Sequence, residues 1–247
     1  KTPRLRALFI IYFGIALSSS TIIVSTVIYV KDYLYLSDTS LAIFMGASGL
    51  GSMIIAFAYS SLNERMSDKQ ITQTGVFILS IAMFLMSYEP VYLISLLVWF
   101  ITGIGLSLSQ IPSGKIVNMS SNPSDRTAYF TAQFSLSHFS WFCGYLLAGE
   151  LAFTYGFSFT ASLFYMIILL CLLFSLLFWP DESSNKDMLH SHEKVLHAHT
   201  HNHDDEHHNH SHNDVIDQSE HTHDHEHKAV THEHKFFIDL HHQSWPK

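Results

Sequence analysis

The chain has 247 residues, of which 48% are hydrophobic and only 14% are charged, about half the charged share of an ordinary globular protein. Its net charge of −8 comes from the segment after Pro180, where 14 acids and 5 lysines give −9, so that residues 1–180 carry +1. Because the tail alone causes the acidic balance, the charge says nothing about nucleic acid, which we do not expect as a partner. The long apolar runs before Pro180 exclude an ordinary soluble domain.

Six apolar segments before Pro180 have about the length needed to cross a bilayer as helices. A membrane core of about 30 Å requires about 20 apolar residues in a helix. In chain order the segments are residues 6–30, 41–61, 71–88, 91–112, 129–153 and 157–179. We therefore predict an all-α membrane protein with six transmembrane helices in a domain of residues 1–180.

The chain opens directly into the first of these segments. It begins with Lys1 rather than Met, and the apolar run from Leu5 to Val30 is too long for a cleavable signal peptide. We therefore expect the sequence to be part of a longer protein.

Basic residues beside the spans predict the orientation, because Lys and Arg are enriched in cytoplasmic loops. Seven of them flank one side of the six spans: Lys1, Arg4, Arg6, Arg65, Lys69, Lys115 and Arg126. Only Lys31 flanks the other side. We therefore predict that the N-terminus of the sequence and the segment after Pro180 both lie in the cytoplasm.

Small and hydroxylated residues inside the spans have two interpretations. Gly46, Gly49 and Gly51 in the second span, with Gly103 and Gly105 in the fourth, favour close helix packing over a role in binding substrate. In the middle of the first span a polar run consists of Ser18, Ser19, Ser20 and Thr21. These hydroxyls either bond back to carbonyls of their own helix or contact a substrate.

Ionisable side chains inside a span are costly and are therefore candidates for function. Only His138 and Glu150 qualify, and both lie in the fifth span. They are twelve residues apart, about 18 Å along a helix, so one ion cannot bind both directly. Gln133 and Gln110 are weaker candidates for the transport pathway. A lone helix histidine more often serves packing or hydrogen bonding than ligation, so both roles stay open for His138.

After Pro180 the chain is polar, low in complexity and rich in the pattern His-x-His with interleaved acids. An extended backbone repeats side chains on one side about every 7 Å, and neutral imidazole is a ligand for nickel, cobalt, zinc and copper. We predict that residues 181–247 form a disordered metal-binding tail, against the alternative of a solvated linker. The expected ligands are His190, His192, His197, His199, His201, His203, His207, His208, His210, His212, His221, His223, His225, His227, His232, His234, His241 and His242.

The connection after the second span reads Leu62-Asn63-Glu64-Arg65-Met66-Ser67-Asp68-Lys69. This resembles the cytoplasmic signature of the major facilitator superfamily, in which an acid–arginine pair and a glycine precede basic residues. Here Glu64 and Arg65 form the pair, Ser67 stands in place of the glycine, and Asp68 interrupts the basic run. The resemblance implies a conformational role for Glu64 and Arg65, and it matches the chain to helices seven to twelve of a twelve-helix fold.

The stretch from Asp125-Arg126 to His138, together with the tail, is similar to the nickel-resistance branch of that superfamily. The resemblance implies a conformational role for Asp125 and Arg126, a bacterial cytoplasmic (inner) membrane, and an N-terminal six-helix half as the missing partner. Glu150 departs from the pattern, since an apolar or small residue is expected at its position.

We therefore expect a transporter rather than an enzyme, with no catalytic cofactor. The leading hypothesis is proton-coupled efflux of a divalent transition metal, nickel or cobalt, and no phosphate-binding loop for ATP occurs in the sequence. The alternative is a carrier for an organic solute or drug whose tail only buffers or senses metal, which the small number of ionisable residues in the spans favours. A six-helix cation-diffusion exchanger is excluded, because no aspartate lies in any predicted span.

Overall fold

The computed structural model describes residues 3–121 and 124–179, together with the backbone of four strands in the tail. The chain divides into two compact units, with the helices in one and the strands in the other. Each unit is described by itself.

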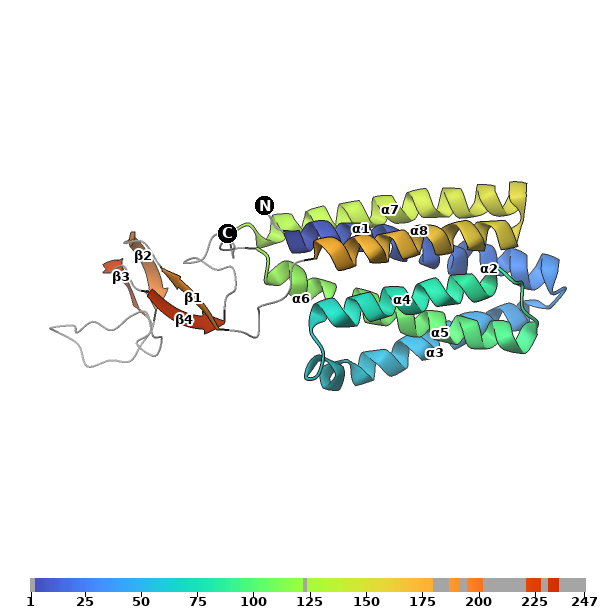
Figure 1. Ribbon diagram of the computed structural model, residues 1–247, viewed down its shortest axis with the longest axis horizontal. Helices are drawn as coiled ribbons and strands as arrows, with labels where there is room; N and C mark the ends of the chain where they lie inside the picture. Colours follow the sequence, from blue (N-terminus) through green and yellow to red (C-terminus); the bar gives the residue numbers. More distant parts are fainter. Residues whose placement is uncertain are drawn as a thin grey trace. The chain divides into compact units, whose positions relative to one another are not determined.

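The helical unit consists of long helices that run side by side (Figure 1). In chain order they are α1 (Pro3–Ser20), η1 (Thr21–Ser25), α2 (Thr26–Ile28), η2 (Tyr29–Tyr33), α3 (Asp38–Asn63), α4 (Asp68–Met86), α5 (Tyr92–Gln110), α6 (Ser113–Asn118), α7 (Arg126–Tyr155) and α8 (Phe157–Phe178). The elements η1 and η2 are wider π-helical turns, and α1 to η2 continue as a single span.

Five helices are long and apolar enough to cross a membrane. They are Arg4–Tyr33, Asp38–Asn63, Asp68–Met86, Tyr92–Asn118 and Phe157–Phe178, and they correspond to five of the six predicted spans. The remaining predicted span, residues 129–153, lies within the 30-residue helix α7, which is not among the five. Polar residues such as Gln133, Ser137 and His138 lower its hydropathy. The domain is thus an all-helical, multi-pass membrane domain, and the sixth crossing stays a prediction.

Local sequence signals determine where several helices begin and end. At the start of α4, the Ser67 hydroxyl accepts a hydrogen bond from the Gln70 amide (3.2 Å), and Gln70 Oε1 accepts one from the Ser67 amide (3.0 Å). This reciprocal capping box satisfies amides that an α-helix leaves unpaired. Between α7 and α8, Gly156 has a φ of +87°, a conformation that side-chain-bearing residues rarely adopt. The tight turn there makes α7 and α8 an antiparallel hairpin.

Glycines allow α5 to approach its neighbours closely. A Cβ on Gly103 would collide with the Ser48 carbonyl of α3, and a Cβ on Gly51 would collide with the Phe100 carbonyl of α5. The helices α3 and α5 therefore touch backbone to backbone, as predicted for these two glycines. By contrast, a Cβ on Gly46 would have no described neighbour within 4 Å, so this glycine does not pack within the domain.

The core lies around α1, while several outer faces expose large apolar side chains. Leu8, Ile11 and Ile15 of α1 are fully buried. Phe57 of α3 and Phe153 of α7 are 83% and 89% exposed. In water such faces would favour aggregation, whereas a lipid bilayer solvates them. The distribution of apolar side chains therefore fits a domain surrounded by lipid.

The polar run of the first span bonds mostly to its own helix. The hydroxyls of Ser18, Ser20 and Thr21 donate to carbonyls four residues earlier, at 3.3, 2.7 and 3.1 Å. Such bonds tend to bend helices, and here the helix widens into η1 directly after them. Ser19 Oγ is buried and has no hydrogen-bond partner among the described residues. For three of the four hydroxyls the structure thus has the back-bonded arrangement.

The tail unit contains four strands, β1 (Asp187–Ser191), β2 (Val195–His201), β3 (His221–His227) and β4 (Thr231–Lys235). Antiparallel pairing joins β1 to β4 and β2 to β3, with register partners such as His199 and His223. The His-x-His alternation has the two-residue period of a strand. The prediction of a disordered tail is not tested by these four segments and stays a prediction.

The side chains of all predicted tail ligands lie outside the described part of the chain. Eight of these histidines lie outside it entirely: His192, His203, His207, His208, His210, His212, His241 and His242. Metal binding by the tail therefore stays a prediction.

Candidate functional site

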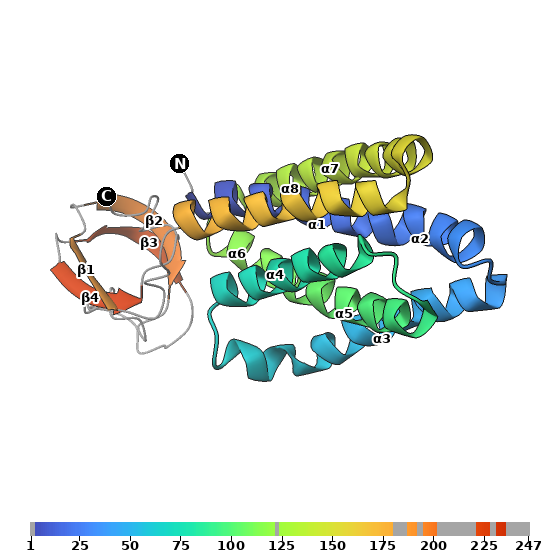
Figure 2. The same ribbon diagram turned by 45° about the vertical axis from the view of Figure 1, so that its right-hand side comes forward.

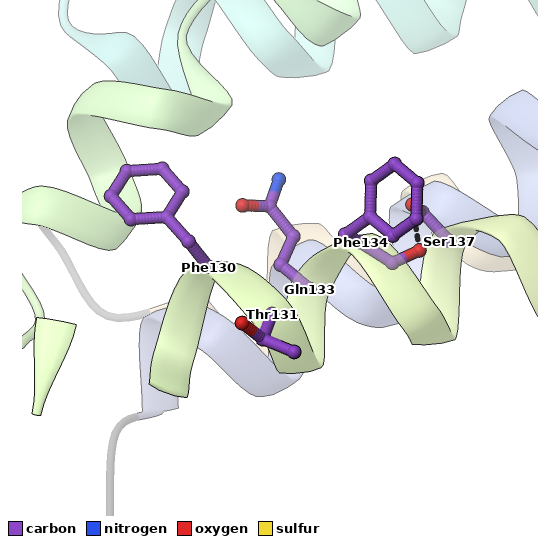
Figure 3. A pocket seen from close by; sticks show the side chains of 5 residues that line it. All are labelled: Phe130, Thr131, Gln133, Phe134 and Ser137. Atoms are coloured by element: carbon purple, nitrogen blue, oxygen red, sulfur yellow. Dashed lines mark hydrogen bonds between the residues drawn. The ribbon is translucent and has the colours of Figure 1, made fainter. Parts of the chain in front are cut away.

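A cavity of about 470 Å³ opens along the first turns of α7. It is lined by Phe130, Thr131, Gln133, Phe134 and Ser137. Figure 3 shows the side chains of Phe130, Gln133 and Phe134 rising from the same side of the helix. The α7 pocket, as we call it, therefore combines two aromatic rings with an amide and two hydroxyls.

Gln133, predicted as a pathway residue, belongs to the wall of the α7 pocket. Its Nε2 donates a hydrogen bond to the Tyr12 hydroxyl of α1 at 3.1 Å. Tyr12 is only 6% exposed and packs in the core cluster around α1. The bond therefore connects the pocket wall to the most buried helix of the domain.

His138 directly follows Ser137, the last residue that lines the α7 pocket, and is exposed. Its ring stacks on Phe134, with centroids 3.8 Å apart, and lies 5.5 Å from the ring of Trp141. Nδ1 is 2.9 Å from the Phe134 carbonyl oxygen. Because a carbonyl oxygen only accepts hydrogen bonds, Nδ1 carries the proton when the ring is neutral. The lone pair is then on Nε2, which is the atom that an ion or a proton would meet.

Glu150 and Gln110, the other predicted pathway residues, are not part of the α7 pocket. Glu150 is exposed near the far end of α7, where its Oε1 accepts a hydrogen bond from Thr154 at 3.2 Å. Gln110 is half-buried at the last residue of α5. Among the described residues, no group of three or more His, Cys, Asp or Glu side chains is placed to hold a metal ion.

The predicted motif pair Glu64–Arg65 is exposed in the turn after α3. Its neighbour Asp68 is instead 5% exposed, and Asp68 Oδ2 lies 2.9 Å from Lys115 Nζ of α6. Sequence reasoning treated Asp68 only as an interruption of the basic run. The signal that identifies it is its place in the first turn of α4, directly after the Ser67 cap, where an acid is favoured by the helix dipole.

Asp125 and Arg126, the second predicted motif pair, lie at the start of α7. Both are half-buried, and among the described residues Asp125 Oδ1 and Arg126 Nε have no hydrogen-bond partner. No ion pair within the described ranges joins this pair to Glu64 or Arg65. The structure does not bring the two predicted motif pairs together through such a contact.

Basic residues concentrate at one end of the helical domain. Figures 1 and 2 show the start of α1, the α3–α4 turn, α6 and the start of α7 at this end, which we call the α6 end. It holds Arg4, Arg6, Arg65, Lys69, Lys115 and Arg126. At the opposite end, Lys31 forms an ion pair with Asp38.

Comparison with known families gives one match. The family model described as Major Facilitator Superfamily matches residues 8–230, which include α1 from its sixth residue, every later long helix and part of the tail. No curated protein matches the chain.

Proposed function

Because this chain belongs to the Major Facilitator Superfamily, a family of secondary membrane transporters, we propose that it exports a divalent transition metal, nickel or cobalt, in exchange for protons. The observation that carries this proposal is the histidine content of the tail. All but one of the 19 histidines lie after Pro180, and imidazole is a strong ligand for these ions.

We propose that the chain acts as one half of the transporter. Carriers of this superfamily alternate access between two six-helix halves around a site near the middle of the membrane. With α7 counted as a sixth crossing, the described helices would make up one such half, and we propose an N-terminal half as its partner. His138 on the exposed face of α7 would contribute one imidazole to the shared route, and the remaining ligands would come from outside the described residues.

The geometry of His138 suggests how metal and proton movement are coupled. The Phe134 carbonyl oxygen, 2.9 Å from Nδ1, accepts a hydrogen bond from it. Only Nε2 is then available to bind a metal ion or a proton. One lone pair binds either a metal ion or a proton, because a coordinating imidazole must be deprotonated at that nitrogen. Metal and proton therefore exclude each other at Nε2, which is the requirement for exchange of one against the other.

Orientation follows from the basic residues of the α6 end. These residues favour the cytoplasm, and the α7 pocket begins at the same end. A helix of 30 residues is about 45 Å long, more than a bilayer core requires, so we propose that α7 is the sixth crossing. The tail then lies in the cytoplasm, where it would collect ions at the side from which they are exported.

The test is proton release from acidified inside-out vesicles that contain the full-length protein. We expect Ni²⁺ or Co²⁺ added outside to discharge the pH gradient and to accumulate inside the vesicles, whereas Mg²⁺ should do neither. A gradient that is insensitive to Ni²⁺ and Co²⁺ in vesicles that contain folded protein would contradict metal export.

The second candidate function is transport of an organic solute or drug. The lining of the α7 pocket favours it, since the five residues comprise two Phe, a Gln, a Thr and a Ser without a carboxylate, thiolate or imidazole. Such a surface suits a flat or amphiphilic molecule better than a bare ion. Discharge of the same pH gradient by a lipophilic aromatic cation, without a response to Ni²⁺, would support this function instead.

A further inference from the structure

A buried carboxylate joins three elements at the α6 end. Oδ2 of Asp68 on α4 pairs with Lys115 Nζ of α6 at 2.9 Å, and Oδ1 accepts from the Tyr59 hydroxyl of α3 at 3.2 Å. The Asn63 amide is oriented so that both of its polar atoms have partners. Asn63 Nδ2 donates to Asp68 Oδ1 at 2.9 Å, and Asn63 Oδ1 accepts from Lys115 Nζ at 3.1 Å. The carboxylate thus has three donors, and Asp68, Lys115 and Asn63 form a closed ring.

The opposite side of α6 is buried in the core. Ile116 and Val117 are each 1% exposed and belong to the cluster that contains Leu8 and Tyr12 of α1. α6 continues the span Tyr92–Asn118 after Ile111 and Pro112, so its position depends on α5 and on these two sides. One side is apolar and the other is the Asp68–Lys115 pair.

Contacts on the core side of α6 connect this helix to the α7 pocket. Tyr12, in the cluster that receives Ile116 and Val117, accepts the hydrogen bond from Gln133 in the pocket wall. The chain also continues from α6 into α7 within a few residues. A displacement of α6 would therefore be transmitted both to the Tyr12–Gln133 contact and to the first turn of α7.

We propose that the Asp68–Lys115 ion pair is a positioning element that fixes α6 and, through it, the α7 pocket. Neither residue lines the pocket, so both act through α6 rather than on a substrate. The inference rests on the proposed function only in placing the α7 pocket on the transport route.

The charges make a specific prediction about paired substitutions. The side chain of Asp68 is 6% exposed and that of Lys115 is 47% exposed. Loss of Lys115 leaves a buried carboxylate without its counter-charge, which costs more than removal of both charges together. Lys115→Met alone should therefore disturb the position of α6 more than the double variant Asp68→Asn/Lys115→Met, in which both charges are removed. Solvent around Lys115 reduces the size of the effect.

The experiment measures the distance between α6 and α7 by double electron–electron resonance between two nitroxide spin labels in the full-length protein. Gly114→Cys and Thr131→Cys carry the labels, since no described atom lies within 4 Å of a Cβ at Gly114 and Thr131 is exposed. The two free cysteines, Cys143 and Cys171, are first replaced by Ala. We expect Lys115→Met to broaden the distance distribution about twofold, because a segment that loses its contacts opens locally.

Two comparisons decide the outcome. The double variant Asp68→Asn/Lys115→Met should return toward the parent width, and Asp32→Asn, an exposed acid at the opposite end of the helical domain, should leave it unchanged. If Lys115→Met leaves the width unchanged, or if the double variant is broader than Lys115→Met alone, the pair does not position α6. Should Lys115→Met fail to fold, recovery of folded protein in the double variant supports the pairing, and no recovery overturns it.

Transport is then measured separately as Ni²⁺ flux in vesicles. A restored distance without any Ni²⁺ flux in the parent protein would contradict the proposed function but leave the positioning role intact. Normal Ni²⁺ flux together with an unchanged distance in Lys115→Met would contradict only the positioning role.

Discussion

Substitution of His138 separates a role in transport from a role in packing. The imidazole is exposed, stacks on Phe134 and bonds to the Phe134 carbonyl within its own helix. An aromatic stack and a hydrogen bond each contribute about 1 kcal/mol. Exposure to solvent makes their sum of about 2 kcal/mol an upper limit for the loss of stability in His138→Ala. We therefore expect most of the protein to remain folded.

The expected loss of transport is larger than the loss of folded protein. Disturbing the environment of a metal ligand lowers affinity about 10- to 100-fold, and removal of the ligand should cost at least as much. Ni²⁺ efflux from loaded cells should therefore fall at least about tenfold in His138→Ala at matched protein level. His138→Gln keeps a polar side chain without an imidazole and should transport no better.

The assay pairs efflux with quantification of the protein in the membrane for the parent and both variants. Phe139→Leu serves as a matched control, because Phe139 is exposed on the same helix and carries no metal-binding atom. A reduced level of His138→Ala that His138→Gln restores, with efflux per molecule unchanged, would refute the transport role and support packing.

Four further outcomes are expected. Truncation after Pro180 should weaken metal tolerance partially but preserve Ni²⁺ transport at saturating metal, and complete loss of transport would place the tail in the pathway. Nickel bound by the full-length protein in excess of that bound by the truncation should fall steeply between pH 7.5 and pH 5, because imidazole, with a reference pKa of about 6.5, binds metal only when neutral; unchanged binding would exclude imidazole ligation. A reporter fused after Lys247 should be active only in the cytoplasm, and periplasmic activity would overturn the predicted topology. Gly103→Val should lower the melting temperature in detergent far more than Gly46→Val, because only the first meets a facing carbonyl, that of Ser48; equal effects would contradict the close α3–α5 contact.

Hydropathy along the chain was sufficient to predict most of the helices. The five apolar helices match predicted spans because a bilayer requires about 20 apolar residues in sequence, which is a local property. The fifth predicted span behaves differently. Residues 129–153 do lie within one helix, α7, but its polar residues keep it outside the apolar set.

The candidate site was predictable in part. Gln133 and His138 stand out as polar residues within an apolar run, which needs only the sequence. That Gln133 lines a pocket and bonds to Tyr12 of α1 required the structure, because the two residues are far apart in the chain. The same applies to Asp68, whose sequence neighbours suggested no partner and whose carboxylate is buried against Lys115 of α6.

Gly46 and Gly51 show most simply what the sequence predicts and what only the tertiary structure decides. Both are small residues on α3, and the sequence predicts the same packing role for each. Only Gly51 faces α5, where the Phe100 carbonyl excludes any side chain, while Gly46 has no described neighbour. Composition and periodicity determine that a segment is a membrane helix, since they govern its transfer from water to lipid. Which face of that helix meets a neighbour depends on the packing of distant segments, and only the tertiary structure decides it.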